Sequence, residues 1–136
     1  MKKKIQVVAA VIEKDHEVLI ARRAQGRALA GYWEFPGGKI EDGELPERAL
    51  ERELWEELSL HTQTGARIGV SLFTDEQTDI ELIAYWSSLI SGTPVLKVHT
   101  ETKWISPHAL HRVQLAPADI ALISWILAAK KFPDKA

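Results

Sequence analysis

Runs of apolar residues alternate with short polar segments in the first part of the chain, and this pattern predicts strands. The β-branched run Ile5–Ile12 is typical of a buried strand. A second strand is expected at Val18–Arg23, because the polar residues Asp15–Glu17 provide a turn. After a loop at Gln25–Gly31, an extended segment is expected at Trp33–Ile40, interrupted by Pro36-Gly37-Gly38.

The second part of the chain adds two helices to further strands. A helix is expected at Pro46–Leu60, where proline suits the first turn. Ala66–Thr74 and Ile80–Leu89 are expected to pair as a hairpin, and Lys103–Ile105 is expected to be a short strand. A last helix is expected at Pro117–Lys131, with an apolar stripe formed by Ile120, Ile123, Ile126 and Leu127. Two helices and a mixed sheet of about six strands predict an α/β fold, an α/β/α sandwich with the sheet between the helices.

Length and composition narrow the classes of protein to consider. The 136 residues suit a single domain spanning 1–136, and a hydrophobic fraction of 46% with 26% charged residues is ordinary for a globular protein. Seventeen Lys and Arg against nineteen Asp and Glu give a net charge of −2, so no nucleic-acid polymer is expected as a partner. No apolar run reaches the roughly 20 residues of a membrane span. The chain has no cysteine, which excludes disulfides and thiolate chemistry and fits a cytoplasmic location.

The helix expected at Pro46–Leu60 combines an apolar stripe with an acidic flank. At about 100° per residue, one line along the helix is formed by Leu50, Leu54 and Leu58. The flank beside it, within an arc of roughly 100°, carries Glu53, Glu56 and Glu57. Ionised carboxylates so close together repel one another, so this flank needs a compensating charge.

Two interpretations of the acidic flank follow from the residues alone. It can be a solvated face balanced by Arg48 and Arg52. It can also be a site for a hard divalent cation, because Mg²⁺ takes a few carboxylates together with water and phosphate oxygens. The pair Gly37-Gly38 ahead of the helix favours the second interpretation, since glycine lets a main-chain carbonyl or amide approach a ligand.

The spacing of these residues resembles the signature of a known family. From Gly38 the chain continues with five residues, Glu44, seven residues, Arg52-Glu53-Leu54, one residue, Glu56-Glu57, one residue and Ser59-Leu60. This order resembles the Nudix box, G-x5-E-x7-R-E-U-x-E-E-x-G-U with U a bulky aliphatic residue, at every position but one. Ser59 stands where the family usually has glycine, and we expect it to fit a left-handed helix cap less well.

Three further segments resemble the MutT-like branch of that family, which acts on nucleoside triphosphates. They are Ala21–Arg23, Trp33–Lys39 and Leu115–Ile120. The last of them is particularly similar to the group of CTP pyrophosphohydrolases within the branch. The resemblance therefore implies an enzyme that uses Mg²⁺ or Mn²⁺ to cut a nucleoside triphosphate into a monophosphate and pyrophosphate. Such a reaction needs cations, which neutralise the charge that builds up at phosphorus.

The box assigns expected roles to the residues around the acidic flank. Glu53, Glu56 and Glu57 should hold the metals, helped by the carbonyl of Gly37 or Gly38. Glu53 could also orient or deprotonate the attacking water. Arg52 has the spacing to pair with Glu56, and both Arg52 and Glu44 are expected to orient other groups without touching metal.

A second set of residues is expected to bind the nucleotide. Arg23, at the end of a strand near the glycines, is a candidate for a phosphate or sugar contact. Lys39, which follows Gly37-Gly38, is a further candidate for binding the substrate. Phe35 matches a base-pocket position of the relatives, and Glu34 beside it could accept a hydrogen bond from the base. Asp119 lies in the first turn of the expected last helix, where a negative charge interacts favourably with the helix dipole. The resemblance implies that Asp119 contacts the base.

Asp119 also leads to an expected substrate preference. An ionised aspartate only accepts hydrogen bonds, so it would select the exocyclic amino group of cytosine. Cytidine triphosphates are therefore expected as substrates, with oxidised purine nucleotides second. Uridine triphosphate, with a carbonyl in place of that amino group, should bind poorly.

One position departs from the pattern of MutT-like relatives. They often carry a metal-assisting glutamate about six residues before a tryptophan that resembles Trp104, and here that position is Val98. The neighbours His99 and Glu101 are the candidates to replace it, and Glu101 is preferred as a carboxylate on a mobile loop.

Two other functions stay open at this level. A Nudix-like domain without catalysis could bind a nucleotide as a sensor, although the three glutamates of the box are all present. A hydrolase of ADP-ribose or another dinucleotide is the other alternative. The expected partner is a small nucleoside triphosphate, and the expected assembly is a monomer or a homodimer.

Overall fold

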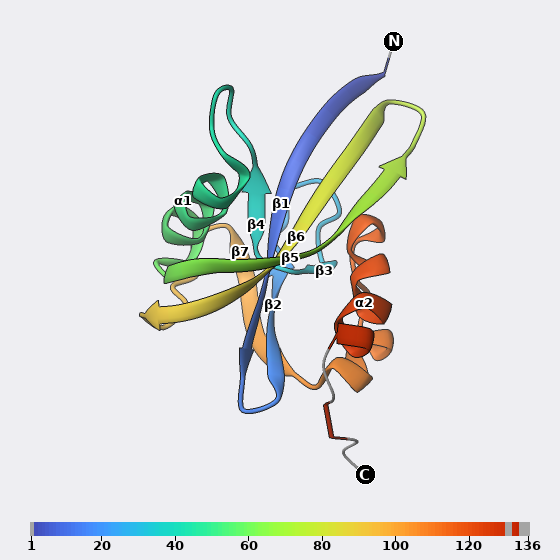
Figure 1. Ribbon diagram of the computed structural model, residues 1–136. Helices are drawn as coiled ribbons and strands as arrows, with labels where there is room; N and C mark the ends of the chain where they lie inside the picture. The colour runs from blue at the N-terminus through green and yellow to red at the C-terminus, as the bar shows by residue number, and fades with distance from the viewer. Residues whose placement is uncertain (1, 130–131, 134–136) are drawn as a thin grey trace.

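A central sheet lies between two α-helices, which cover its opposite faces (Figure 1). The computed structural model describes residues 2–129 and 132–133. Within these residues the strands are β1 (Lys3–Lys14), β2 (Glu17–Arg23), β3 (Trp33–Glu34), β4 (Gly37–Lys39), β5 (His61–Thr74), β6 (Thr78–Ser91) and β7 (His99–Ile105). The helices are α1 (Pro46–Leu58) and α2 (Ala121–Ala129), and 3₁₀ turns occupy Pro107–Arg112 and Pro117–Asp119. The expected α/β/α arrangement is confirmed.

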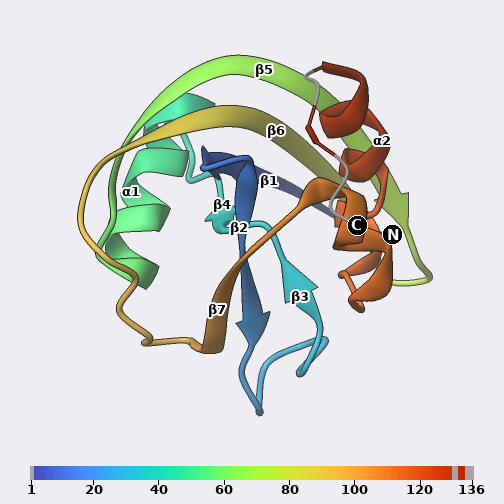
Figure 2. The ribbon, with the colours of Figure 1, turned by 90° about the horizontal axis from the view of Figure 1, so that it is seen from below.

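Strand β1 is the centre of the sheet, whose order is β3-β2-β1-β6-β5. It pairs in parallel with β6 and antiparallel with β2 and β4, so the sheet is mixed as expected. The expected hairpin is confirmed as the antiparallel pair β5 and β6, which arch from α1 to α2 (Figure 2). Strand β7 pairs with β2, and this places the residues after Val98 beside the end of β2.

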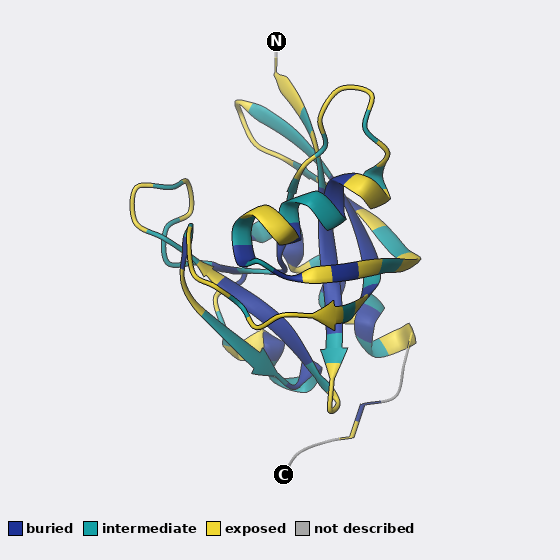
Figure 3. Ribbon diagram, turned by 90° about the vertical axis from the view of Figure 1, so that its left-hand side faces the viewer, coloured by how far each residue is buried: buried dark blue, intermediate teal, exposed yellow. Residues whose placement is uncertain are grey.

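Helix α1 packs its leucine stripe against one face of the sheet. Leu50, Leu54 and Leu58 are at most 1% exposed, as the helical spacing predicts. Val8 and Ile12 of β1 point into the same cluster, because alternate residues of a strand face the same side. Figure 3, seen from this side, shows the exposed positions of α1 on its outer surface.

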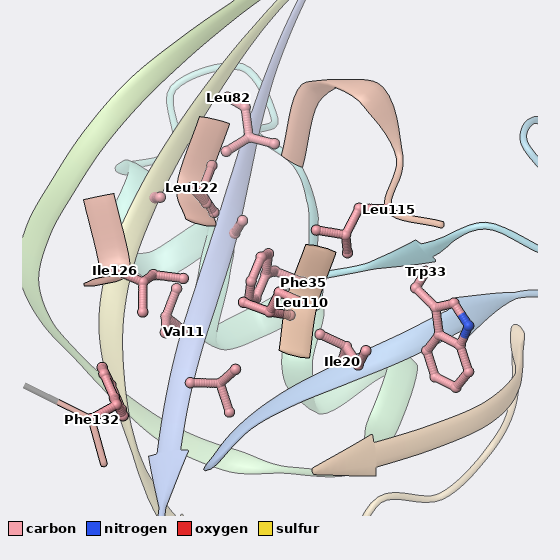
Figure 4. Close-up of a cluster of buried hydrophobic side chains, with 13 residues drawn as sticks. Val11, Ile20, Trp33, Phe35, Leu82, Leu110, Leu115, Leu122, Ile126 and Phe132 are labelled. Carbon is pink, nitrogen blue, oxygen red and sulfur yellow. The ribbon is translucent and has the colours of Figure 1, made fainter. Parts of the chain in front are cut away.

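Helix α2 closes the other face, where a second cluster includes Val11, Ile20, Phe35 and Leu110 (Figure 4). The apolar stripe expected for this helix is partly wrong. Ile120 is 54% exposed, and the fully buried residues are Leu122 and Ile126. The error has a local cause: Pro117–Asp119 form a 3₁₀ turn, so the α-helix begins only at Ala121 and its buried face is rotated.

Several expected boundaries also shift. Helix α1 ends at Leu58, since Ser59 adopts a left-handed conformation with φ 57°, the cap geometry in which glycine is common. The extended segment breaks at Phe35-Pro36, while Gly37 and Gly38 lie inside β4. Lys130 and Lys131, at the expected end of the last helix, lie outside the described residues. Among the described helices, none is both long and apolar enough to cross a membrane.

Candidate active site

Arg52 of α1 is the centre of an ion-pair network that joins the helix to the segment before it. Its Nε donates to Glu44 Oε2 at 2.7 Å and its Nη2 donates to Glu44 Oε1 at 2.9 Å, a two-point contact that fixes the guanidinium plane. Its Nη1 donates to Glu53 at 2.9 Å and to Glu56 at 2.7 Å. The contact between Arg52 and Glu56 that the spacing predicts is therefore present.

The same arginine reaches strand β4. Its Nη2 donates to the carbonyl oxygen of Lys39 at 3.1 Å, while the Lys39 side chain is exposed. Hydrogen bonds from Arg52, and from the backbone of Glu41, hold the pKa of Glu44 below its usual range. The contacts of Glu44, chiefly, raise the pKa of Arg52. Glu44 and Arg52 thus stay charged and hold each other, and together they set where Glu53 and Glu56 point.

Glu53 and Glu57 lie where water reaches them poorly. Burial raises the pKa of Glu53, and Arg52 opposes this effect. Burial, together with the charge of Glu53, raises the pKa of Glu57 to about 7. Gly38 lets the backbone of β4 lie close to Glu53, because a Cβ at that position would collide with the Glu53 carboxylate. The glycine, expected from sequence to bring backbone close to a ligand, brings it close to Glu53.

These carboxylates suit a divalent cation by their chemistry. Two half-buried acids that repel each other gain from a cation, and hard cations prefer carboxylate oxygens. Within the described residues, however, no three Asp, Glu or His side chains already stand at metal-ligand spacing. Arg52 occupies Glu53 and Glu56, so a cation would have to share these two carboxylates with it. Glu57 has no such contact with Arg52 and is the carboxylate most open to a cation.

A second charged cluster forms where β2, β3 and β7 meet. Ala21 of β2 pairs with Glu34 of β3, and Arg23 of β2 pairs with His99 of β7. As a result Arg23 Nη1 lies 2.7 Å from Glu34 Oε1, and His99 Nε2 lies 2.8 Å from Glu34 Oε2. Burial raises the pKa of Glu34, but the contacts with His99 and Arg23 outweigh it, so the pKa lies below the usual range. Glu34 is an ionised acceptor.

His99, one of the two residues proposed from the sequence to replace the glutamate missing at Val98, lies in this cluster. It is 4% exposed, and its Nδ1 is buried with no hydrogen-bond partner among the described atoms. The signal available in the sequence was its place next to Val98, at the start of a strand. Glu101, the preferred candidate, was expected on a mobile loop but lies within strand β7. Its carboxylate is half exposed and lies 3.9 Å from Arg22 Nη1.

Asp119 is buried against the segment that leads to the glycines. Its Oδ2 accepts a hydrogen bond of 2.8 Å from the backbone N–H of Phe35. Leu115 forms a β-bridge with Trp33 of β3, and this pairing brings the turn that carries Asp119 alongside β3. Burial, aided by the charge of Glu34, raises the pKa of Asp119 to about 8.

Two expectations about this end of the site need correction. Asp119 was expected to be ionised in the first turn of a helix, but it is buried in a 3₁₀ turn and its raised pKa keeps it neutral at neutral pH. Phe35 was expected to line the base pocket, but its side chain is 3% exposed and packs in the hydrophobic cluster (Figure 4). Phe35 contributes its backbone amide, which holds Asp119.

The chain is similar to known proteins in both sequence and fold. The NUDIX domain family model matches residues 2–126. The chain is 38% identical over 126 residues to a CTP pyrophosphohydrolase of Escherichia coli, with 93% of each chain covered. It is 33% identical over 132 residues to an 8-oxo-dGTP diphosphatase of Haemophilus influenzae, again with 93% of each covered. The solution structure of the E. coli ORF135 protein superposes with a TM-score of 0.83 at 36% identity, covering 96% of this chain and 93% of that one.

The family model spans α1 with its glutamates, both glycines of β4 and the turn that carries Asp119. The match thus includes both charged clusters, and the fold of the relatives agrees with the sheet described above. The chain belongs to the Nudix family.

Proposed function

We propose that the protein is a nucleoside triphosphate pyrophosphohydrolase that depends on Mg²⁺ or Mn²⁺. Water and a nucleoside triphosphate give a nucleoside monophosphate and pyrophosphate, and the bridge between the α- and β-phosphorus is broken. The observation that carries the proposal is the pair of half-buried glutamates, Glu53 and Glu57, beside the backbone of Gly38. The family membership and the names of the relatives support it.

The residues of α1 divide the work between binding and positioning. Glu53, Glu56 and Glu57, with the carbonyl of Gly37 or Gly38, would hold the cation. When bound, the cation supplies neutralisation of the phosphates and polarisation of the phosphoryl oxygen. Glu53 accepts a proton from the attacking water, for which its raised pKa suits it. Arg52, fixed by Glu44, keeps Glu53 oriented through the 2.9 Å contact.

Glu34 and Asp119 form the base-reading end of the proposed site. Glu34 is an ionised acceptor, and Asp119 is a neutral carboxyl with one donor and one acceptor. The neutral group can donate to N3 of cytosine while it accepts from the N4 amino group. It can equally donate to the O6 carbonyl of an oxidised guanine and accept from the neighbouring N1–H.

This arrangement changes which residue distinguishes cytosine from uracil. A neutral Asp119 can turn to suit either edge, so it does not reject uracil. Ionised Glu34 accepts a hydrogen bond from the cytosine amino group and repels the uracil carbonyl, so Glu34 is the residue that selects cytosine over uracil. We propose cytidine triphosphates and oxidised purine nucleoside triphosphates as substrates. To contact the substrate, Arg23 has to share or exchange its 2.7 Å contact with Glu34. A cytoplasmic location and a monomeric or homodimeric state stay predictions.

A panel of nucleotides tests the proposal. The purified protein is incubated with Mg²⁺ and each of CTP, UTP, 8-oxo-dGTP, ADP-ribose and a dinucleoside polyphosphate, while pyrophosphate, monophosphate and phosphate are followed. Pyrophosphate released from CTP or 8-oxo-dGTP supports the proposal. Turnover of ADP-ribose alone, or nucleotide binding without turnover, would replace it by one of the two alternatives. Glu101→Gln serves as a control, because it removes a carboxylate outside both clusters.

A further inference from the structure

The loop between β2 and β3 is held by arginines that donate to backbone carbonyls. Arg22 donates from Nε to the carbonyl oxygen of Gly31 at 3.1 Å, and Arg23 donates from Nε to that of Ala28 at 2.6 Å. Arg27 belongs to the loop itself and donates from Nη1 to the carbonyl oxygen of Val98 at 3.1 Å. This third contact carries the loop across to the segment that enters β7.

Arg27 differs from Arg23 and Arg52 in the number of guanidinium N–H donors that remain free. Arg52 contacts four glutamates, and Arg23 is bound to Glu34 at 2.7 Å. Within residues 2–129 and 132–133, the Arg27 side chain makes a single hydrogen bond, to the Val98 carbonyl oxygen, and forms no ion pair. A guanidinium has five N–H donors, so most of those of Arg27 remain for a ligand.

The position of Arg27 lies between the two charged clusters. Val98, whose carbonyl it contacts, directly precedes His99, which holds Glu34 at 2.8 Å. On the other side, Lys97 directly precedes Val98, and its Nζ donates to the carbonyl oxygen of Glu56 in α1 at 3.2 Å. The backbone that Arg27 contacts therefore joins the cluster around Glu34 to the glutamates of α1. The phosphates of a bound triphosphate must lie between the base-reading end and the metal-binding glutamates, and Arg27 borders that space.

We propose that Arg27 is a substrate-binding residue that contacts a phosphate oxygen of the nucleotide. The inference rests on the proposed function, since it takes the triphosphate as the ligand. A guanidinium matches a phosphate with two parallel N–H donors, and such charge-assisted bonds are stronger than neutral ones. Arg27 is already half-buried and tethered at Val98, so it loses less side-chain freedom on binding than an exposed arginine would.

The substitution Arg27→Gln separates this role from that of holding the loop. Glutamine keeps an N–H donor for the Val98 carbonyl but has no charge for a phosphate. Arg22→Gln is the matched control, because Arg22 also holds the loop by donating to a backbone carbonyl. Its ion-pair partner is Glu101, which belongs to neither charged cluster. For the parent and each variant, KM and kcat for CTP are measured, together with binding of pyrophosphate and of CMP by calorimetry in the presence of Mg²⁺.

We expect Arg27→Gln to raise KM for CTP by roughly tenfold or more, as the loss of one charged phosphate contact predicts. Binding of either pyrophosphate or CMP should weaken by a similar factor, and the product affected identifies which phosphate Arg27 contacts. Arg22→Gln should leave all these values near those of the parent. An Arg27→Gln variant with unchanged KM and unchanged binding of both products would overturn the inference.

A second variant covers the case in which Arg27→Gln disturbs folding. Arg27→Lys keeps the charge and loses the two-point geometry, so its KM should lie between those of the parent and the glutamine variant. Equal impairment in both variants, with a lowered melting temperature, would show that Arg27 only holds the loop. If the parent itself cleaves no triphosphate, the proposed function fails, and the binding of pyrophosphate and CMP still tests Arg27.

Discussion

Asp119 accepts a hydrogen bond from the backbone amide of Phe35 at 2.8 Å, and this contact joins the turn before α2 to the segment that leads to the glycines. The aspartate is buried, and its pKa of about 8 leaves it neutral at neutral pH. The contact therefore places a carboxyl with both a donor and an acceptor beside the ionised Glu34.

The burial of Asp119 predicts how stability depends on pH. Because the pKa of Asp119 is higher in the folded protein than in the unfolded chain, its contribution to stability is present at low pH. That contribution decreases as pH rises toward and through about 8. Asp119→Asn cannot ionise, so its melting temperature should exceed that of the parent by more at about pH 9 than at about pH 6. Thermal unfolding across this range checks it, and parallel curves for the two proteins would contradict it.

Substitution of Asp119 should also separate shape from hydrogen bonding in base recognition. At neutral pH, Asp119→Asn keeps a donor and an acceptor, so kcat/KM for CTP should stay within roughly tenfold of the parent. Asp119→Leu keeps the branched shape and removes both hydrogen-bonding groups, so kcat/KM for CTP should fall by more than that. Steady-state kinetics on CTP measure the difference. A leucine variant as active as the asparagine variant would show that Asp119 is only structural.

Glu34 is expected to decide between cytosine and uracil. Glu34→Gln replaces the ionised acceptor by an amide that can present either its oxygen or its nitrogen. The ratio of kcat/KM for CTP to that for UTP should shrink by roughly tenfold. The ratio is measured with both nucleotides in competition. If it is unchanged while overall activity falls, Glu34 holds Arg23 and His99 and does not read the base.

Glu57→Gln should remove a cation ligand and, at the same time, a buried carboxylate that is repelled by Glu53. The pKa of Glu57, raised to about 7, means that ionising it costs stability as pH rises through that value. In chelator at about pH 8 the variant should therefore melt at a higher temperature than the parent. Added Mg²⁺ should stabilise the parent and have less effect on the variant. The same variant should lose most of its turnover, and an increase of its melting temperature by Mg²⁺ equal to that of the parent would place the cation elsewhere.

Glu44 is expected to act through Arg52. Glu44→Gln loses the charge that fixes the guanidinium plane, so Glu53 and Glu56 lose their common orientation. We expect kcat to fall by roughly tenfold to a hundredfold with little change in KM for CTP. Glu101→Gln is the comparison variant and should stay near the parent. A larger effect of Glu101→Gln would restore that residue as the assisting carboxylate.

The part of the site that lies on one helix could be predicted from the sequence. The burial of Leu50, Leu54 and Leu58 and the contact of Arg52 with Glu56 follow from helical spacing alone. The two-point contact of Glu44 needs the path of the chain before the helix, and there only the resemblance to the Nudix box pointed to it.

The second charged cluster could not be predicted in this way. Arg23, Glu34 and His99 come from three strands, and only the pairing of β2 with both β3 and β7 brings them together. Strand pairing depends on contacts distant in sequence, which periodicity does not encode. The protonation of Asp119 is likewise a consequence of burial, and burial follows from the path of the turn around residue 117 and not from the residue type.

The most direct test of the account is the stoichiometry of the products formed from CTP, measured with Mg²⁺ in the parent and in Glu53→Gln. The account predicts one CMP and one pyrophosphate for each CTP consumed by the parent. It predicts almost no turnover by the variant, which lacks the carboxylate held between Arg52 and Gly38. Release of CDP and phosphate, or equal turnover by parent and variant, would contradict it.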